Sequence, residues 1–326
     1  MYERIASNVR KTWLLIFVFV AFVMVIGWFF GEFLDIGWWG LAGAVGFAIA
    51  MTWGSYFASD RIALAMSRAE LADPIRFQQL HNIVEGLCLA AGMPKPRVYV
   101  VQDQAPNAFA TGRNPEHAAI AVTTGLMEKL DRDELEGVLA HELSHVKNRD
   151  TLVMTIAVTL VGVIVLLADW MLRAMWWGGG GDRDRGGGLG APLALIGLLL
   201  LILSPIIAQL LQFAISRQRE FLADADGVFL TRHPDGLIGA LEKLRTDQTV
   251  VRSASRATAH LWIESPIARH AHEGRSRTNK QGAWLNRLFD THPPLETRIE
   301  ALRSSALSGS MPPSQPPAPP PPPAET

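Results

Sequence analysis

Four long stretches of this chain contain no aspartate, glutamate, lysine or arginine, and they constrain the fold more than any other feature. They are residues Thr12–Gly31, Ile36–Ser59, Thr151–Ala168 and Leu189–Ser216. Charged residues make up 19% of the 326 residues, below the roughly 25% that is usual in soluble domains. All of the charges lie in the remaining segments. This distribution excludes a uniform soluble globule, and it also excludes a protein made entirely of membrane segments.

The net charge and the cysteine content exclude further classes of protein. A net charge of −1 argues against a nucleic-acid-binding protein, which usually carries a strongly basic face. The chain has a single cysteine, Cys88, so it has no internal disulfide framework and no cysteine-based zinc site. We expect Cys88 to be a small buried apolar residue rather than a reactive thiol.

The uncharged stretches are long enough to cross a bilayer, which takes about 20 apolar residues in a helix. Trp13–Phe30 is interpreted as a retained anchor, because its apolar run is longer than that of a cleaved signal peptide. Further spans are expected at about Trp38–Phe57, Thr151–Trp170 and Ala191–Ile215. For the last two, a buried or re-entrant helical hairpin is the alternative, because the third span is only marginally long and Asp169 lies near its end.

An excess of basic residues flanks the expected spans on one side only, because the loop 178–190 between the third and fourth spans holds two Asp and two Arg and is neutral. The flanking basic residues are Arg4, Arg10, Lys11, Arg61, Arg68, Arg217 and Arg219. The short loop between the first two spans contains only acidic charges, Glu32 and Asp35. Because lysine and arginine accumulate in cytoplasmic loops, we expect both termini and both soluble segments to face the cytoplasm.

The soluble segments combine helices with a few short strands. In the first, the pattern predicts a helix over Pro74–Gly92, three strands, and a helix capped by Asp131 or Asp133 that runs to Val146. The three strands are expected over Arg97–Gln102, Asn107–Gly112 and Ala118–Thr124. The second segment is expected to begin with a helix from about Arg217 and to end with a helix after Pro294.

A pair of histidines lies in the last helix of the first soluble segment, in the motif His141-Glu142-Leu143-Ser144-His145. Residues four apart share one face of a helix, so His141 and His145 can bind one metal ion. Glu142 is rotated by about 100° from His141, which places it to reach a metal-bound water rather than to act as a ligand. The alternative interpretation is an ordinary polar helix face.

A catalytic zinc ion takes three protein ligands and a water, so one more ligand is expected elsewhere. Glu220 and Asp224 lie four residues apart just after the fourth uncharged stretch, and therefore face the same way. One can bind the metal while the other accepts the outer N–H of a liganding histidine. The alternative is a solvated acidic face paired with Arg217 or Arg219. Two antiparallel spans would return the chain to the membrane face it left, beside His145.

Three motifs resemble the signatures of the HtpX-type membrane zinc metalloproteases, which are relatives of the Oma-type and CAAX prenyl endopeptidases. They are HELSH at 141–145, SRQREFLADADG at 216–227 and THPPLETRI at 291–299. The resemblance implies an α+β, mostly α, gluzincin-like zinc metallopeptidase domain with a small β-sheet, fused to about four transmembrane helices. It assigns one zinc ion per chain to His141, His145 and Glu220, and it assigns catalysis to Glu142.

The resemblance also implies a biological role. It implies an endopeptidase that hydrolyses damaged or misfolded membrane proteins, as part of a stress response, at the cytoplasmic face of a bacterial inner membrane. The partners would be polypeptide substrates and the lipid bilayer, without nucleic acid. An inactive scaffold or chaperone that retains the fold is one alternative. A metal-binding transporter is another, although its ligands would be expected inside the spans.

Further residues are expected around the zinc ligands. The tetrahedral oxyanion of peptide hydrolysis needs a donor besides the metal, and His292 is our candidate. Arg298 either assists it or holds a carboxylate in the site, while Asp224 is the expected partner of a liganding histidine. For His292 the alternative is a simple helix cap. An edge strand that pairs with an extended substrate is expected at Asn107, Ala108, Phe109 and Ala110. The alternative there is an ordinary hairpin strand.

The chain is therefore expected to divide into five parts. Residues 1–59 form two transmembrane helices, and 60–150 form a cytoplasmic catalytic segment with the HExxH helix. Residues 151–215 form a transmembrane helical hairpin. Residues 216–308 form a second cytoplasmic catalytic segment, which supplies the third zinc ligand. Residues 309–326 form a disordered proline-rich tail.

Overall fold

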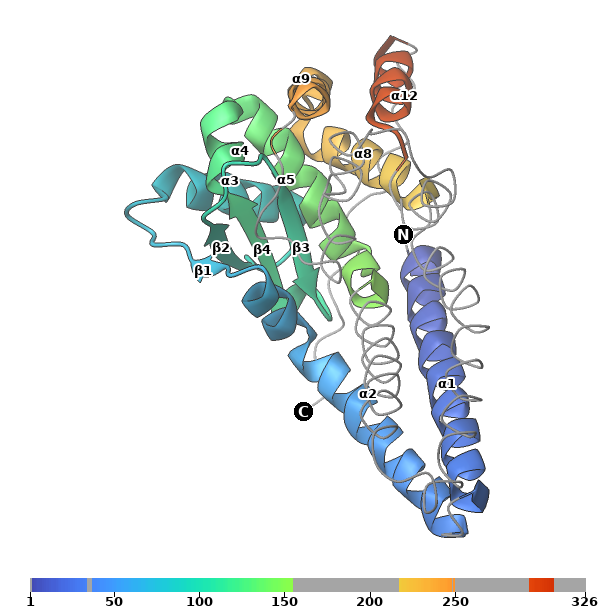
Figure 1. Cartoon of the computed structure of the whole chain (residues 1–326). Helices are drawn as coiled ribbons and strands as arrows, with labels where there is room; N and C mark the ends of the chain where they lie inside the picture. The colour runs from blue at the N-terminus through green and yellow to red at the C-terminus, as the bar shows by residue number, and fades with distance from the viewer. Residues whose placement is uncertain (1, 34–36, 155–216, 248, 250–292, 308–326) are drawn as a thin grey trace, which may run out of the picture.

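The computed structural model describes residues 2–33, 37–154, 217–247, 249 and 293–307 (Figure 1). Most of the two later expected spans, His292 and the proline-rich tail lie outside the described residues. Within the described part, two long helices extend from a body that contains a small sheet and the remaining helices (Figure 1).

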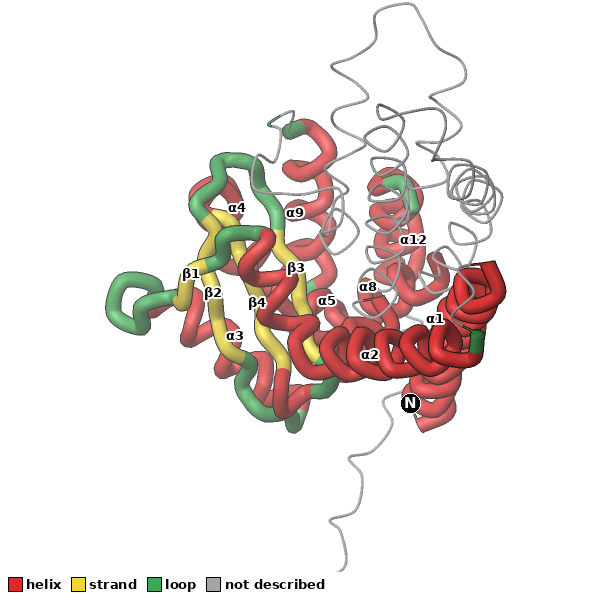
Figure 2. The backbone as a smooth tube through the Cα atoms, turned by 60° about the horizontal axis from the view of Figure 1, so that its bottom comes forward, coloured by secondary structure: helices red, strands yellow, loops and turns green. Residues whose placement is uncertain are grey.

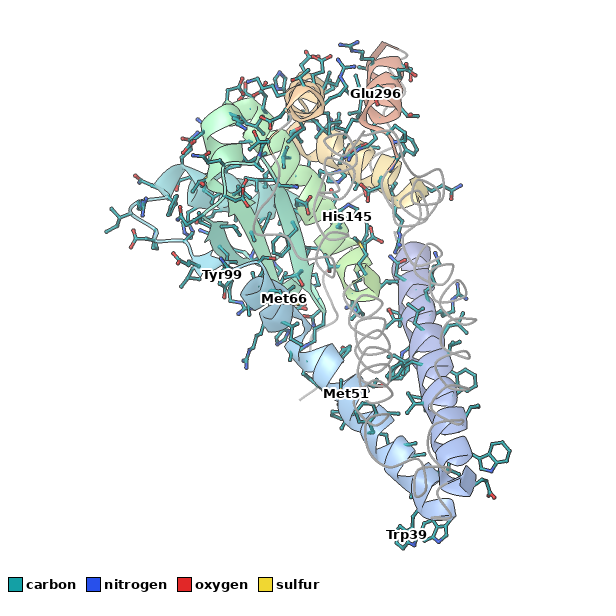
Figure 3. The ribbon with its side chains drawn as sticks, viewed as in Figure 1. Trp39, Met51, Met66, Tyr99, His145 and Glu296 are labelled. Atoms are coloured by element: carbon teal, nitrogen blue, oxygen red, sulfur yellow. The ribbon has the colours of Figure 1, made fainter. Side chains whose placement is uncertain are left out.

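The two long helices are α1 (Tyr2–Phe33) and α2 (Trp38–Met66), which pack against each other. By length and composition both are able to cross a membrane, over Ala6–Val25 and Trp38–Ala58. Apart from Leu71, Ile75 and Leu89, the large hydrophobic side chains that are exposed among the described residues all lie on these two helices. Figure 3 shows Trp39 at the tip of the helix pair, remote from the body. The first two expected spans therefore coincide with helices that expose many large apolar side chains.

The body contains a four-stranded mixed sheet with the order β1-β2-β4-β3 (Figure 2). The strands are β1 (Glu70–Leu71), β2 (Arg97–Val101), β3 (Ala108–Gly112) and β4 (Ala118–Thr123). β2 and β4 are parallel, whereas the other two neighbouring pairs are antiparallel. Three of these strands were predicted to within one residue at each end, while the two-residue β1 was not predicted. β3 lies at one edge of the sheet.

Helices surround this sheet and the centre of the body. They are α3 (Gln78–Ala91), α4 (Thr124–Lys129), α5 (Arg132–Lys147), α8 (Arg217–Thr231), α9 (Pro234–Thr246) and α12 (Leu295–Leu307), with a short 3-10 turn at Pro115–His117. Helix α3 begins at Gln78 rather than at Pro74, because the Asp73 side chain accepts hydrogen bonds from the backbone N–H groups of Ile75 and Arg76 and forms a turn there. Helices α4 and α9 were not predicted.

Both faces of the sheet are covered, which explains why all six residues of β4 are buried. Successive side chains of a strand point to opposite faces. Ile120 accordingly belongs to the main core with residues of α3, α5 and α9, whereas Ala121 packs on the other face with Leu64 of α2. The end of α2 is thus part of the packing of the body, and it joins one of the long apolar helices directly to the sheet.

Helix α5 is the central element of the body. Its start is fixed by a capping box: the Asp131 side chain accepts from the Glu134 N–H at 2.9 Å, and the Glu134 carboxylate accepts from the Asp131 N–H at 2.9 Å. Asp131 is thus one of the two caps that the sequence predicted. Nearly every residue from Glu134 to Val146 is buried, because α5 contacts α3, α8, α9 and β3.

Candidate metal centre

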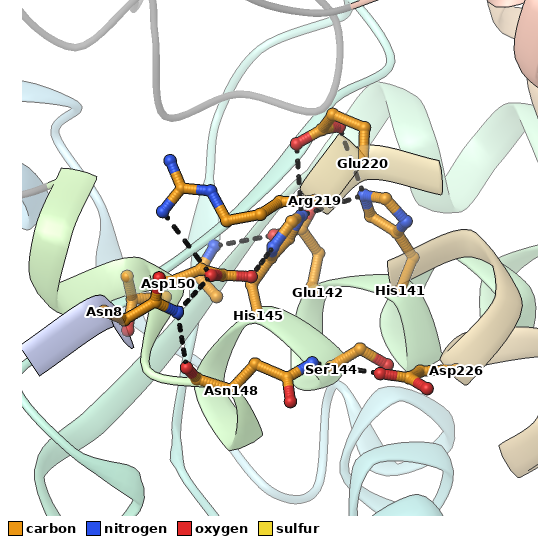
Figure 4. A network of polar contacts seen from close by, with 12 residues as sticks. Asn8, His141, Glu142, Ser144, His145, Asn148, Asp150, Arg219, Glu220 and Asp226 are labelled. Atoms are coloured by element: carbon orange, nitrogen blue, oxygen red, sulfur yellow. Dashed lines mark hydrogen bonds and ion pairs between the residues drawn. The ribbon is translucent and has the colours of Figure 1, made fainter. Parts of the chain in front are cut away.

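Helices α5 and α8 bring three potential metal ligands together (Figure 4). His141 and His145 come from α5 and Glu220 comes from the first turn of α8, and all three side chains are buried. One ligand atom from each lies within 4.8 Å of the others. The fold therefore brings together residues that lie up to 79 positions apart in the sequence, from His141 to Glu220.

The distances between these ligand atoms suit a single ion. The two histidine Nε2 atoms are 3.2 Å apart, and the Glu220 carboxylate oxygens lie 3.4 Å from His145 Nε2 and 3.7 Å from His141 Nε2. Ligand atoms about 2.0–2.1 Å from a tetrahedral zinc ion are separated by about 3.4 Å. The donor set of two imidazoles and one carboxylate is also one that zinc prefers.

The close approach of α8 to α5 depends on Gly227. Glu220, Asp224 and Gly227 lie on one stripe of α8, at spacings of four and three residues. A Cβ atom on Gly227 would lie 3.1 Å from the backbone nitrogen of His141 and 3.3 Å from its Cα atom. The absence of a side chain at Gly227 therefore lets α8 pack closely enough for the two acidic side chains to reach the histidines.

Asp224 orients His141. Its Oδ1 atom lies 2.9 Å from His141 Nδ1, which places the N–H on Nδ1 and leaves the Nε2 lone pair toward the ligand cluster. Arg298 of α12 donates two hydrogen bonds to Asp224, from Nε to Oδ2 at 2.8 Å and from Nη2 to Oδ1, the oxygen that also contacts His141, at 2.5 Å. Arg298 is fully buried. This contact corresponds to one of the two roles expected for Arg298, while His292, its expected partner in the other role, lies outside the described residues.

His145 has an equivalent partner that was not anticipated from the sequence. Asp150 Oδ2 lies 3.0 Å from His145 Nδ1. Arg149 adopts a left-handed conformation, with φ 58°, directly after α5, and the Asp150 that follows this turn reaches the histidine. Only the proximity of an aspartate to the end of the HExxH helix hinted at this contact.

The charges of the centre favour a divalent cation. Among the described residues, four buried carboxylates meet two almost fully buried guanidinium groups: Glu142, Asp150, Glu220 and Asp224, with Arg219 and Arg298. Buried charges are strongly unfavourable unless they are balanced by partners. A bound ion of charge +2 would balance the remaining negative charge.

The two histidines have pKa values shifted in opposite directions. Burial and the Arg298 guanidinium lower the pKa of His141 to about 4, against the opposing effect of Asp224. Burial also lowers the pKa of His145, but Asp150 and Glu220 outweigh it and raise this pKa to about 9. His141 is therefore neutral at pH 7, whereas a metal ion binding to His145 competes with a proton.

Glu142 connects the ligand cluster to the edge of the sheet. It is buried, and its Oε2 atom accepts a hydrogen bond from the backbone N–H of Ala110 in β3 at 2.9 Å. Ala108, Phe109 and Ala110 lie in this edge strand, and Asn107 immediately precedes it. All five residues of β3 are buried. His292, the expected oxyanion donor, lies outside the described residues.

The sequence has clear relatives. It matches peptidase family M48 over residues 74–306. It is 47% identical over 309 residues to a protease HtpX homolog from Caldanaerobacter subterraneus subsp. tengcongensis, and the alignment covers 93% of this chain and 97% of that protein. It is 41% identical over 309 residues to a protease HtpX homolog from Streptococcus gordonii, covering 93% of this chain and 99% of that protein.

Among solved structures, the crystal structure of S. mikatae Ste24p is similar, with a TM-score of 0.47 and 16% identity. That similarity covers 93% of this chain and 67% of that chain. The sequence match to the M48 family spans most of the chain and includes both histidines, Glu220 and Arg298. This chain therefore belongs to peptidase family M48.

Proposed function

We propose that the buried cluster is the active site, in which His141, His145 and Glu220 hold a zinc ion and Glu142 is the catalytic base. Membership of peptidase family M48 and the HtpX relatives make the protein a metallopeptidase. The observation that carries the assignment is the position of Glu142: it follows the first ligand on α5 and is hydrogen-bonded to the edge strand.

The residues of the site have separable tasks. A zinc ion held there would supply Lewis-acid polarisation of the scissile carbonyl and would acidify water. Asp224 and Asp150 keep the N–H of each histidine on Nδ1, so that each Nε2 presents its lone pair to the cluster. The Glu142 carboxylate, steadied by the Ala110 N–H, accepts the proton of the attacking water and delivers it to the leaving amine.

Replacing the base tests the assignment. Glu142→Gln keeps the shape of the side chain but removes its basicity, so peptide hydrolysis should fall by about 10²–10⁴-fold. The zinc content per chain should stay unchanged. Glu136→Gln is a matched control on the same helix and should retain full activity. Undiminished hydrolysis by Glu142→Gln would reject the assigned base, whereas a wild-type protein that cleaves no polypeptide would favour an inactive scaffold.

Metal removal gives an independent test of the cofactor. A zinc chelator should abolish hydrolysis, and stoichiometric zinc should restore it, because two imidazoles and one carboxylate form a donor set that holds a catalytic zinc ion. The same zinc addition should not restore Glu142→Gln. Activity that survives complete removal of metal, verified by elemental analysis, would contradict a zinc mechanism.

We further propose that β3 pairs with the substrate in an extended conformation. The Ala110 N–H points toward Glu142, so a substrate strand added along this edge would pass next to the base. Since β3 is buried, substrate binding must displace what covers it. In the Glu142→Gln protein, an uncleaved peptide should slow hydrogen exchange within residues 108–112. Unaltered exchange in this segment with the peptide bound would argue against β3.

The membrane arrangement is also a proposal. The body is joined to the N-terminal end of α1 and the C-terminal end of α2, the ends that carry the basic flanks (Figure 1). We propose that these ends and the body face the cytoplasm of a bacterial inner membrane, with residues 151–215 forming two further spans.

Cysteine labelling can test this orientation, because Cys88 is the single cysteine and is buried. In a Cys88→Ala background, an impermeant maleimide added to intact cells should label Asp35→Cys in the connection between α1 and α2. It should not label Ile75→Cys, whose parent side chain is 89% exposed on the body. The reverse labelling pattern would show the opposite orientation.

We propose damaged or misfolded membrane proteins as the substrates. Two long apolar helices lead directly into the body that contains the site, which suits the capture of substrates at the bilayer surface. Proteomic comparison of membranes from cells with the wild-type or the Glu142→Ala protein should reveal membrane proteins that accumulate in the variant. Accumulation of soluble proteins alone would contradict this choice.

A further inference from the structure

The first turns of α1 contact the end of the HExxH helix (Figure 4). The Asn8 side chain is only 5% exposed, and its Nδ2 atom donates two hydrogen bonds. One goes to the Asn148 carbonyl oxygen at 2.9 Å and the other to Asp150 Oδ1 at 2.7 Å. Asn8 and Asp150 are 142 residues apart in the sequence, so this contact is a product of the tertiary fold.

Asp150 transmits this contact to the metal centre. Its Oδ1 atom accepts from Asn8, while its Oδ2 atom lies 3.0 Å from His145 Nδ1. A carboxylate that is engaged at both oxygens has its plane and direction fixed. The guanidinium of Arg219 is farther away, with its Nη1 atom 3.5 Å from Asp150 Oδ1. Asn8, Asp150 and His145 thus form a continuous chain of short contacts that ends at the ligand cluster.

The position of Asp150 explains why it needs an external donor. It lies beyond the end of α5, after Arg149 with its positive φ of 58°, so the helix that carries the two histidines does not itself fix the aspartate. The Asn8 amide contacts both sides of this turn, at Asn148 before it and at Asp150 after it. It therefore ties the turn to one conformation.

We propose that Asn8 is a positioning residue of the metal centre, which acts on His145 through Asp150. The helix that supplies it, α1, is one of the two apolar enough to cross a membrane. Docking of this helix would then raise the metal affinity of a site formed by residues far along the chain. The inference rests on the proposed zinc site, and it adds a structural link between that site and the membrane helix.

Zinc dissociation constants of the full-length protein in detergent, measured by competition with a chelating dye, test this role without any assay of hydrolysis. Partners of metal-bound histidines typically change metal affinity by about 10–100-fold, so Asp150→Ala should weaken zinc binding in that range. Asn8→Ala acts one contact further out and should weaken it by about 3–10-fold. In an Asp150→Ala background, adding Asn8→Ala should have no further effect, because the two act in series.

Two variants separate the hydrogen bond from mere packing of α1. Asn8→Asp preserves the shape of the side chain but removes its donor, so zinc binding should weaken at least as much as in Asn8→Ala. Thr12→Val alters a buried residue one turn later, whose hydroxyl bonds only to the Asn8 carbonyl oxygen among the contacts described. Thr12→Val should bind zinc with the wild-type dissociation constant.

Each outcome of these zinc-affinity measurements either supports or contradicts the role of the Asn8 amide. Wild-type zinc affinity in Asn8→Ala and Asn8→Asp would overturn the proposal, as would an equal loss in Thr12→Val, because either shows that the amide does not act on the site. Additive effects of Asn8→Ala and Asp150→Ala would also overturn it. Failure of the wild-type protein to bind zinc would instead reject the proposed metal site on which this inference depends.

Discussion

The two histidines of the metal centre are oriented by the same kind of contact but are anchored in different parts of the chain. In the His141 half, Asp224 contacts His141 and is held by Arg298 of α12. In the His145 half, Asp150 contacts His145 and is held by Asn8 of α1. One half is thus secured by helices of the body, and the other by a helix that is apolar enough to span a membrane.

The two anchors also differ in charge. Arg298 is a fully buried cation with two hydrogen bonds to Asp224, whereas Asn8 is a neutral amide. This difference contributes to the opposite pKa shifts of the histidines, because the guanidinium beside His141 disfavours its protonation and the carboxylates around His145 favour it. Removing the partner of a buried charge should therefore destabilise the protein more than removing the partner of a neutral amide.

The largest expected effect comes from removing a zinc ligand, and it should be the same in both halves. His141→Ala and His145→Ala should each weaken zinc binding by about a hundredfold or more, because each removes one of only three protein ligands. Zinc per chain after dialysis against a weak chelator measures this. The exposed His117→Ala should retain one zinc. A full zinc complement in either ligand variant would show that the halves do not share one ion.

The identity of the metal ligands is the part of the site that the sequence can predict. The i, i+4 spacing of His141 and His145 and the spacing of Glu220 and Asp224 are local properties of two helices, and the structure keeps them. The pairing of α5 with α8 followed from the expected return of the chain to one membrane face. Three strands and the α5 cap are equally local and were predicted from turn and capping residues.

The anchors could not be predicted in the same way. Asn8 contacts Asp150 across 142 residues, and no periodicity or motif records such a contact. Asp150 depends on an arginine in a left-handed conformation, where a glycine would have been the recognisable signal. Tertiary contacts decide both of these features. Helix α9 is a different case: it lacks a side-chain hydrogen bond at its N-terminal cap, but Pro234 at its start and Asp235 in its first turn are sequence signals that could have predicted it.

The second prediction separates the halves through stability. Asp224→Ala leaves the buried Arg298 without its main partner and should lower the free energy of unfolding by about 3–5 kcal/mol. Asp150→Ala leaves the Asn8 amide unpaired and removes the longer 3.5 Å contact with Arg219, and should cost about 1–3 kcal/mol. Unfolding of both variants in detergent, without metal, gives the comparison. Equal losses would mean that the charge of the anchor does not distinguish the halves.

A smaller change should perturb the His141 half selectively. Gly227→Ala places a Cβ atom 3.1 Å from the His141 backbone nitrogen, so α8 must move away and carry Asp224 with it. Overpacking of this kind costs about 1–3 kcal/mol, and zinc binding should weaken as well. Thermal unfolding and zinc competition measure the two effects.

Gly86 provides the control for that substitution. It lies on an exposed part of α3, and a Cβ atom there would meet nothing within 4 Å. Gly86→Ala should therefore stabilise the protein by up to about 1 kcal/mol, the difference in helix propensity, and leave zinc binding unaltered. If Gly227→Ala behaved like Gly86→Ala, the close packing of α8 on α5 would not be what positions the acidic ligands.

The smallest expected effect comes from the N-terminal cap of α5, at the opposite end of that helix from the two histidines. Asp131→Ala removes the capping box that begins the helix and should cost about 1 kcal/mol of stability. The histidines are two to four turns away and are held by their own carboxylates, so zinc affinity should not change. A parallel loss of zinc affinity would show that the site follows the overall stability of α5, and the two anchors would then lose their separate roles.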